Sequence, residues 1–293
     1  MSSPILVLGS NGQVGWELQR SLAVLRPVVA ATREHCDLAS EDAVRSLVSA
    51  CKPCAIVNAA AYTAVDAAQT DVEQAMQLNA VLPAVLADEA TRARAWLIQY
   101  STDYVFDGGK PAPYVEDDAT APLGVYGHSK LAGEHAARAC ERHVILRTSW
   151  VFGVHGGNFL KTMLRLGAER DTLQVVDDQI GAPTSAALIA DVTAHVLAQL
   201  LSGHGAAGTY HLASGGHTSW CGYARYIMSE AARLGASLRC TPQAVQPITS
   251  AAWPTPASRP ANSRLDTSRL AGTFGLALPA WQGQVSRVLQ VLL

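Results

Sequence analysis

The chain has 293 residues, 49% hydrophobic and 16% charged, and a formal net charge of −2 at pH 7. This composition can bury a sizeable core, which excludes intrinsic disorder, and the near-neutral charge gives no general attraction for nucleic acid or an anionic membrane. No apolar run approaches the roughly 20 residues needed to cross a bilayer, and the first residues lack the basic region of a secretory signal. The six cysteines are scattered, as in a reduced cytosolic protein. We therefore expect a cytoplasmic protein with no nucleic-acid partner and no membrane partner.

The first half of the chain alternates short, β-branched apolar runs with amphipathic stretches. Nearly continuous apolar strands separated by helices are typical of a parallel sheet covered on both faces. We therefore predict an α/β, doubly wound (Rossmann) domain that binds NAD(P) over residues 1–150. The predicted strands are residues 5–8, 28–31, 55–58, 97–101 and 144–148, and the predicted helices are residues 13–25, 42–50, 79–94 and 129–142.

Beyond residue 150 the sequence becomes richer in glycine and proline. Segments of this kind, at 153–158, 181–184, 203–208 and 254–260, separate shorter elements, and the last predicted helix is 282–293. This pattern predicts that residues 151–293 form mainly a smaller substrate-binding lobe. We expect this lobe to be interleaved with the first domain rather than joined to it by a linker.

A glycine-rich turn directly follows the first predicted strand. Gly9, Gly12 and Gly15 have the Gly-x-x-Gly-x-x-Gly spacing of short-chain dehydrogenases. The first glycine permits a tight turn, the second lets the backbone approach a pyrophosphate, and the third allows close helix–strand packing. The N–H groups at the helix start then bind the anion. A glycine triplet also occurs in simple turns, but its place between a strand and a helix favours a dinucleotide site.

The end of the second predicted strand indicates which cofactor is bound. An NAD enzyme places Asp or Glu there to bind the ribose hydroxyls, whereas this chain has Thr32 and Arg33. A guanidinium can hold a 2′-phosphate by paired hydrogen bonds. We therefore expect NADPH, with the use of NADH left open. The alternative is that Arg33 is only a solvated loop charge.

A tyrosine and a lysine four positions apart are the candidate catalytic pair. On a helix, Tyr126 and Lys130 share one face, and a nearby ammonium favours the phenolate, which lowers the phenol pKa from about 10. Such a phenol can supply the proton that a carbonyl needs when hydride reduces it. Thr102, at the end of a central strand, can hydrogen-bond the carbonyl oxygen beside Tyr126. Together the three residues predict a carbonyl reductase.

Six segments carry a resemblance that covers most of the chain. They are GQVGWEL (12–18), VNAAAYTAVD (57–66), YSTDYVF (100–106), RTSW (147–150), DQIGAPT (178–184) and PASRP (256–260). With them the chain resembles the dTDP-4-dehydrorhamnose reductase family of extended short-chain reductases. The resemblance implies reduction of the 4-keto group of dTDP-4-dehydro-β-L-rhamnose by NADPH, the last step in making dTDP-L-rhamnose, a cell-surface polysaccharide precursor.

The resemblance also implies residue roles. Tyr126 would donate the proton, Lys130 would be its partner and hold the nicotinamide ribose, and Thr102 would complete the catalytic set. Tyr126 and Lys130 would also contact the cofactor. The other cofactor-binding residues would be Gly9, Asn11, Gly12, Gln13, Val14, Gly15, Arg33, Asp37, Leu38, Ala61, Tyr62 and Thr63. The substrate would be bound by Thr102, Asp103, Trp150, Asn158 and Arg259.

Some relatives dimerise around Mg²⁺ held by glutamates. Glu17 matches one of these, but the other matching positions hold Ala187 and Val291, which cannot ligate. We therefore expect no metal site, and an oligomer, if formed, without a magnesium bridge.

The substrate diphosphate needs a cationic site in the second lobe. Arg259 and Arg264, in a proline-bounded loop, could clamp it bidentately, unless they form surface salt bridges instead.

Two other functions remain open. One is another nucleotide-4-keto-sugar enzyme, either a reductase, an epimerase or a 4,6-dehydratase, although Tyr104 stands where a dehydratase would have its Glu. The other is a non-catalytic binding subunit, such as the regulatory subunit of methionine adenosyltransferase, which resembles this fold.

Overall fold

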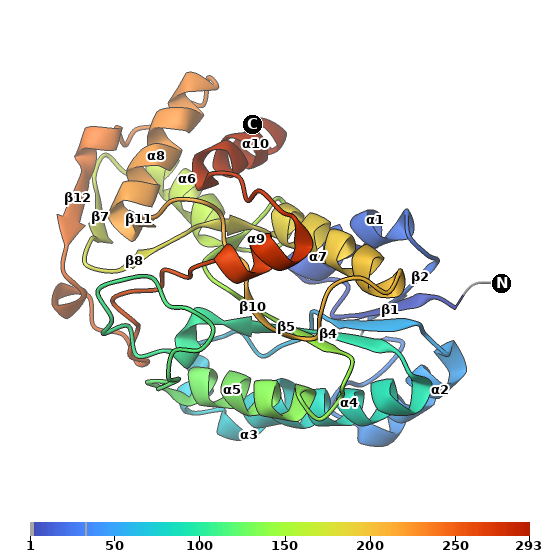
Figure 1. Cartoon of the computed structure of the whole chain (residues 1–293). Helices are drawn as coiled ribbons and strands as arrows, with labels where there is room; N and C mark the ends of the chain where they lie inside the picture. The colour runs from blue at the N-terminus through green and yellow to red at the C-terminus, as the bar shows by residue number, and fades with distance from the viewer. Residues whose placement is uncertain (1–2, 33) are drawn as a thin grey trace.

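A six-stranded parallel sheet forms the centre of the larger lobe (Figure 1). The computed structural model describes residues 3–32 and 34–293. The strand order is β10-β5-β4-β3-β1-β2, so the chain winds outward in both directions from the β1–β3 pair. The strands are β1 (Ile5–Leu8), β2 (Val28–Ala31), β3 (Ala55–Asn58), β4 (Trp96–Thr102), β5 (His143–Thr148) and β10 (Gly208–His211). The predicted doubly wound fold is confirmed.

Helices cover both faces of this sheet (Figure 1). One face is covered by α1 (Gln13–Ala23), α7 (Ala186–Leu201) and α9 (Ser268–Phe274). The other is covered by α2 (Glu41–Cys51), α4 (Leu82–Ala93) and α5 (Val125–Ala137), with the short α3 (Val72–Met76) and a π-helical turn (Gln77–Val81) before α4.

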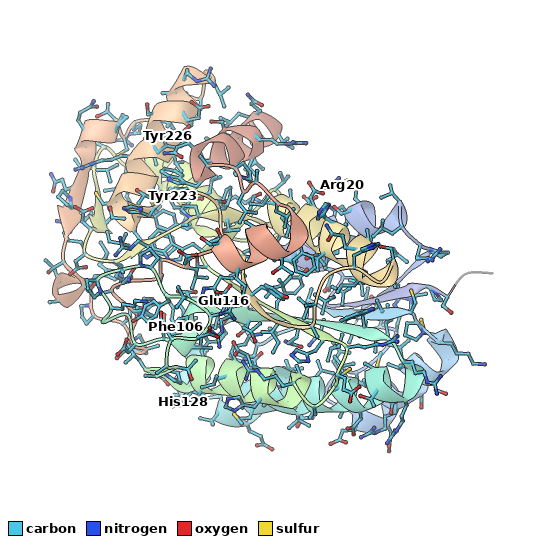
Figure 2. All side chains as sticks on the ribbon, in the orientation of Figure 1. Arg20, Phe106, Glu116, His128, Tyr223 and Tyr226 are labelled. Carbon is cyan, nitrogen blue, oxygen red and sulfur yellow. The ribbon has the colours of Figure 1, made fainter. Side chains whose placement is uncertain are left out.

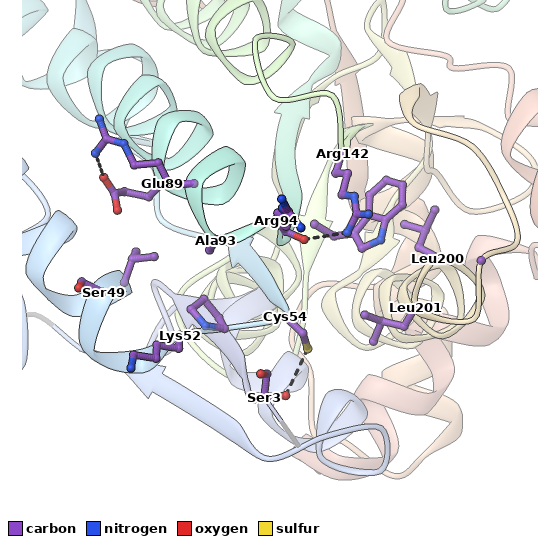
Figure 3. Close-up of a pocket in the computed structure, with 15 residues that line it drawn as sticks. Ser3, Ser49, Lys52, Cys54, Glu89, Ala93, Arg94, Arg142, Leu200 and Leu201 are labelled. Atoms are coloured by element: carbon purple, nitrogen blue, oxygen red, sulfur yellow. Dashed lines mark hydrogen bonds and ion pairs between the residues drawn. The ribbon is translucent and has the colours of Figure 1, made fainter. Parts of the chain in front are cut away.

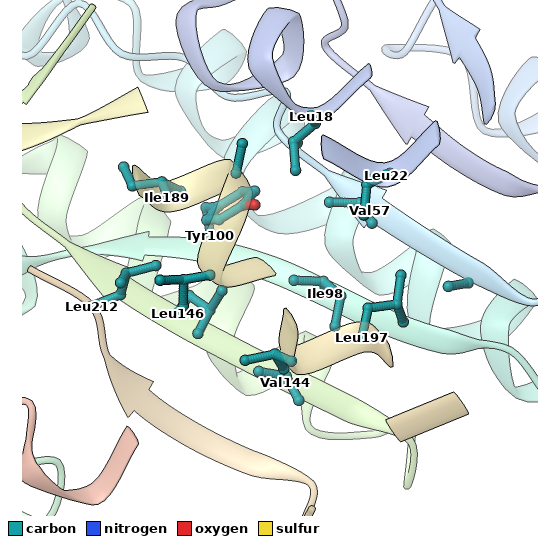
Figure 4. Packing of buried hydrophobic residues seen from close by; sticks show 14 of the residues in the cluster. Leu18, Leu22, Val57, Ile98, Tyr100, Val144, Leu146, Ile189, Leu197 and Leu212 are labelled. Atoms are coloured by element: carbon teal, nitrogen blue, oxygen red, sulfur yellow. The ribbon is translucent and has the colours of Figure 1, made fainter. Parts of the chain in front are cut away.

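The apolar strand residues enter these two cores. Towards α1 and α7, Val57 and Ile98 pack with Leu18, Leu22 and their neighbours at 0% exposure (Figure 4). Because β1 and β3 are buried on both faces, their sequences are almost continuously apolar, whereas β4 is apolar at its start and becomes polar towards its carboxyl end.

The smaller lobe has its own core. It consists of α6 (Phe159–Glu169), α8 (Trp220–Arg233) and α10 (Trp281–Leu292) against a parallel pair, β7 (Leu173–Val176) and β12 (Val245–Ile248). Tyr223 of α8, which Figure 2 labels, is buried in this core. The remaining short elements are β6 (Val151–Phe152), β8 (Ile180–Gly181), β9 (Thr184–Ser185), β11 (Thr218–Ser219) and single turns at Ala67–Gln69, Asp103–Val105, Pro242–Ala244 and Ser250–Ala252.

The second half of the chain also builds the larger lobe. α7, β10 and α9 all follow residue 150, yet they pack on the central sheet. The division near residue 150 stays a prediction. None of the described helices is long and apolar enough to cross a membrane.

Two predicted helices differ from the structure. α5 begins at Val125 instead of residue 129, because Gly124 starts it and Gly127 lets it pass against the Tyr104 carbonyl, where a Cβ would clash. The stretch predicted as one helix over 79–94 begins instead in the π-helical turn, which contains Asn79. A polar Asn within an amphipathic pattern does not indicate that the helix begins with a π-helical turn.

Candidate active site

Two loops meet at the carboxyl edge of the sheet, where the strand order reverses. The turn after β1 touches the segment after β3 so closely that a Cβ on Gly9 would lie 2.6 Å from the amide nitrogen of Ala60. Gly9 also has a φ of +70°, which favours glycine, and a Cβ on Gly15 would clash with the Gly9 carbonyl oxygen. Ligands of doubly wound sheets bind at this reversal point.

The start of α1 fits a phosphate. Gly12 is the N-cap residue and provides no side-chain acceptor, so the first N–H groups of the helix remain available to an anion. Gln13 is held from the second lobe, since its Oε1 accepts a 3.0 Å hydrogen bond from Asn158 Nδ2. His155 stacks on Trp16 with centroids 4.7 Å apart. The residues present therefore fit a dinucleotide diphosphate, and the contacts of Gln13, Val14 and Gly15 with it stay a prediction.

Asn79 fixes the segment predicted to line the nicotinamide side. Its Oδ1 accepts from the Tyr62 N–H at 2.9 Å, and its Nδ2 donates to the Tyr62 carbonyl at 3.0 Å and to Ser129 Oγ at 3.0 Å. The residues Ala61 and Tyr62 are thereby tied to α5, while Thr63 is exposed. Sequence reasoning missed Asn79, although π-helical turns often occur at functional sites.

The predicted adenine side lies after β2. Asp37 is exposed and caps its own turn by accepting from the Ala39 N–H at 3.0 Å, while Leu38 packs partly into the core under α2. Arg33 lies outside the described residues, so its proposed contact with a 2′-phosphate stays a prediction.

The structure brings Tyr126, Lys130 and Thr102 together. Tyr126 and Lys130 lie one turn apart on α5, and Thr102 ends β4 beside them. The Thr102 hydroxyl lies close enough to Tyr126 to affect its pKa, while Lys130 Nζ donates a 2.7 Å hydrogen bond to the Tyr100 carbonyl. His128, between the pair in sequence, is exposed on the outer side of α5 (Figure 2).

The pKa values of this pair differ from the sequence expectation. Burial raises the pKa of Tyr126 to about 12, and the neighbouring Thr102 hydroxyl opposes that rise. Burial lowers the pKa of Lys130 to about 8, against the attraction of Glu134. The ammonium is directed at a carbonyl rather than at the phenol, so the desolvation of Tyr126 outweighs the predicted lowering of its pKa. The phenol is therefore protonated at neutral pH and can donate.

Asp103 is a buried carboxyl at the same edge. Burial raises its pKa to about 6, and the nearby Ser263 and Thr102 hydroxyls oppose that rise. Its Oδ1 accepts from Thr102 Oγ1 at 3.1 Å, whereas no group in the described part of the chain bonds its Oδ2. A buried polar atom without a partner is rare, and substrate binding by Asp103 stays a prediction.

A buried ion pair supports the catalytic helix from below. Glu134, one turn beyond Lys130, is fully buried and accepts from Arg147 at 2.7 and 2.8 Å, from Ser101 Oγ at 2.6 Å and from Arg138 at 2.8 Å. These bonds join α5 to β4 and β5 beneath the catalytic pair. The sequence analysis did not identify Glu134. The pattern that could have indicated it is an acidic residue four positions after Lys130, on the same face of the helix.

A cavity of about 860 Å³ lies in the second lobe, between α6, β7, β12 and the segment 253–259. Arg259 lines it and donates to Asp66 at 2.8 and 3.2 Å, and Tyr104 lies close enough to raise the pKa of Arg259. The Tyr104 ring meets that of Tyr126 edge-on at 5.5 Å. Arg259 thus joins the cavity to the catalytic tyrosine. Arg264 bonds Asn262 and the Pro111 carbonyl instead, so the expected pair of arginines is not formed.

The other two predicted substrate residues have structural contacts. Asn158 caps α6 by accepting from the Lys161 N–H at 3.1 Å and donates to Gln13, so it lies between the two loops. Trp150 has a φ of +49° and stacks on Trp220 with centroids 3.6 Å apart. Contact of either residue with a substrate stays a prediction.

A second large cavity, of about 890 Å³, lies at the opposite, amino-terminal edge of the sheet (Figure 3). Lys52, Arg92, Arg94 and Arg142 line it where α2, α4 and α7 end. Cations at helix carboxyl ends compensate the helix dipoles, and this cavity contains none of the residues predicted for catalysis.

No group of three or more His, Cys, Asp or Glu side chains in residues 3–32 and 34–293 could hold a metal ion. Glu17 pairs with Arg20 at 3.4 Å, and Val291 is 64% exposed on α10.

The sheet, the glycine turn at its reversal point and the Thr–Tyr–Lys set define an extended short-chain reductase. The sequence matches the family described as "RmlD substrate binding domain" over residues 3–293. It is 48% identical to the dTDP-4-dehydrorhamnose reductase of Salmonella typhimurium, covering 97% of this chain and 96% of that one. The chain belongs to the dTDP-4-dehydrorhamnose reductase family, as its motifs predicted.

Solved structures of this family agree with the fold. The dTDP-4-dehydrorhamnose reductase from Bacillus anthracis, in complex with NADP, has a TM-score of 0.91 at 32% identity, covering 99% of this chain and all of that one. The Clostridium acetobutylicum structure has a TM-score of 0.91 at 34% identity, covering 99% of each chain.

Proposed function

We propose that this chain reduces the 4-keto group of dTDP-4-dehydro-β-L-rhamnose with NADPH, giving dTDP-L-rhamnose. The observation that carries this proposal is the chain of contacts from Tyr126 through Tyr104 to Arg259, which lines the second-lobe cavity. In the proposed complex the sugar of the nucleotide sugar lies at Tyr126 and its diphosphate at Arg259. Family membership and the NADP-bound relative support the reaction and the cofactor.

The side chains at the edge of β4 carry out the proton chemistry. Bound NADPH supplies the hydride. Tyr126, protonated at neutral pH, donates its proton to the carbonyl oxygen, and Thr102 hydrogen-bonds the same oxygen as its negative charge develops. The product hydroxyl keeps that proton, and solvent later returns one to the phenolate.

Lys130 and Asp103 position the reactants. A charged Lys130 favours the phenolate that remains after transfer, and the buried environment strengthens this attraction. Asp103 Oδ2 accepts a sugar hydroxyl, which would satisfy its missing hydrogen bond.

Arg259 is held ready for the diphosphate. The Arg259 guanidinium holds the pKa of Asp66 below its ordinary value, so the pair stays ionised through the neutral range. The two terminal nitrogens of Arg259 each donate one hydrogen bond to Asp66. Because a guanidinium has five N–H donors, Arg259 can bind an anion while it stays paired with Asp66.

The test is a panel of dTDP-, UDP- and GDP-4-keto-6-deoxysugars, with loss of NADPH absorbance as the readout. We expect turnover with the dTDP sugar and the dTDP-L-rhamnose stereochemistry in the product. Turnover of a UDP or GDP sugar alone would support another keto-sugar reductase. No turnover, together with a stable complex with methionine adenosyltransferase, would support the binding-subunit alternative.

Three further properties complete the proposal. The protein works in the cytoplasm, where nucleotide sugars are made. It has no nucleic-acid partner, in keeping with its net charge of −2. Any oligomer forms without a magnesium bridge.

A further inference from the structure

The rim of the substrate cavity carries an exposed indole. Trp253 is 60% exposed although it lines the cavity. The other aromatic side chains of the cavity wall are already packed: Trp220 stacks on Trp150, and Phe159 lies against both Trp220 and Tyr223. Within the described residues, Trp253 has no aromatic partner. Its ring faces are therefore available to a ligand.

The turn that carries Trp253 is fixed in place. Both carboxylate oxygens of Asp178 accept from the Ser250 N–H at 2.9 Å, and Oδ1 also accepts from Ser250 Oγ at 2.6 Å. Gln179 Nε2 donates to the same hydroxyl at 2.9 Å, and the Trp253 N–H donates to the Ser250 carbonyl at 3.0 Å. Charge-assisted bonds of this kind are about twice as strong as neutral ones. The indole is thus presented by an anchored turn.

The order of residues along this wall matches the order of groups in a nucleotide sugar. Arg259 lies at the catalytic end, beside Tyr104 and Asp66. Thr255 and Trp253 lie earlier in the same segment, and both line the cavity. With the sugar at Tyr126 and the diphosphate at Arg259, the nucleoside must extend into the part of the cavity that Trp253 borders.

We propose that Trp253 is the stacking platform for the pyrimidine base of the nucleotide-sugar substrate, and that Asp178 is a positioning residue that holds this platform. The inference rests on the proposed function for the identity of the ligand. A planar base stacks on an aromatic face, and an indole offers the largest such face among the side chains. Phe159 is the rival platform, but its contacts with Trp220 and Tyr223 leave it less available.

The test is calorimetric titration of dTDP into the NADP⁺-loaded protein, with inorganic pyrophosphate as a competing ligand that lacks the base. Trp253→Ala should weaken dTDP binding by roughly 5- to 150-fold, the range that base–aromatic stacking supplies. It should leave the pyrophosphate inhibition constant unchanged. Trp253→Phe should retain most of the affinity, and Val24→Ala, which removes an exposed apolar group at the end of α1, should retain all of it.

Asp178→Ala tests the anchoring. It should weaken dTDP binding and raise KM for the keto-sugar, with kcat and pyrophosphate inhibition unchanged, and Asp178→Asn, which keeps an acceptor for Ser250, should partly restore both. Unchanged dTDP affinity in Trp253→Ala would overturn the proposal, as would equal losses for dTDP and pyrophosphate, which would show a general collapse of the cavity.

Failure of the proposed function gives a different result. If the wild-type protein binds dTDP through Trp253 but leaves every keto-sugar unreduced, the function fails and the platform stands. If the wild-type protein reduces the dTDP sugar and Trp253→Ala has the same KM, the platform alone fails.

Discussion

Replacing Asp103 with Asn should change the free energy of unfolding, relative to wild type, more favourably at high pH than at low pH. Burial raises the pKa of Asp103 from its ordinary 3.8 to about 6. In the unfolded chain the carboxyl ionises near its ordinary pKa, so above pH 6 the folded state bears the unfavourable buried charge. One pKa unit corresponds to 1.36 kcal/mol, so two units correspond to about 3 kcal/mol of lost stability at about pH 8. At pH 4, close to the ordinary pKa, about 0.5 kcal/mol of this loss remains, and it vanishes below about pH 3, where both states are protonated.

The assay is urea unfolding of both proteins at several pH values between about 4 and 8. An amide has its own cost in this pocket, but that cost does not depend on pH. The difference in unfolding free energy between Asp103→Asn and wild type should therefore move in favour of the variant by about 2 kcal/mol across this range. Asp118→Asn is the control of opposite sign, because its hydrogen bond from Lys110 lowers the pKa of Asp118. A difference for Asp103→Asn that stays constant with pH would refute the reasoning.

Four further outcomes are expected. Tyr126→Phe should lower kcat by about 10² or more with NADPH binding little changed, and near-normal turnover would place the proton donor elsewhere. Because burial lowers the pKa of Lys130 to about 8, kcat should fall as pH rises through that value, and a flat alkaline profile would contradict this. Arg33→Ala should weaken NADPH binding by about 1.5–3 kcal/mol and NADH binding less, as paired titrations would show; equal losses would remove the 2′-phosphate role. Oligomeric state, measured by light scattering, should not change with EDTA, since Glu17 alone supplies too few ligands; a dimer that dissociates on chelation would contradict this.

The sheet was predictable from sequence because its signal is local. Strands β1, β2 and β3 lie at the predicted residues, β4 is longer than predicted by one residue at each end, and β5 begins one residue earlier. Burial on both faces demands continuous apolar residues, which a short window reveals. The start of α5 was missed because Tyr126 and Gly127 face the site and the Tyr104 carbonyl, so they break the apolar periodicity.

The catalytic set was predictable for the same reason, whereas the contacts that complete the site were not. Tyr126 and Lys130 lie one helical turn apart, so their spacing reveals a shared face. Arg259 and Asp66 are 193 positions apart, and no sequence pattern indicates that they pair. The direction of the Tyr126 pKa shift was also hidden, because it depends on how deeply the fold buries the phenol.

Burial acts differently on the three ionisable groups of the catalytic edge, and this explains how one environment serves both folding and chemistry. Glu134 keeps its charge because Arg147 and Arg138 surround it, so the pair can anchor α5. Lys130 and Asp103 have no such full set of partners, and burial disfavours their charged forms. A ligand hydroxyl at Asp103 Oδ2 would favour the carboxylate, and the phenolate left after proton transfer would favour the ammonium. The groups that cost the free protein stability are therefore those whose charge is stabilised when the substrate binds and reacts.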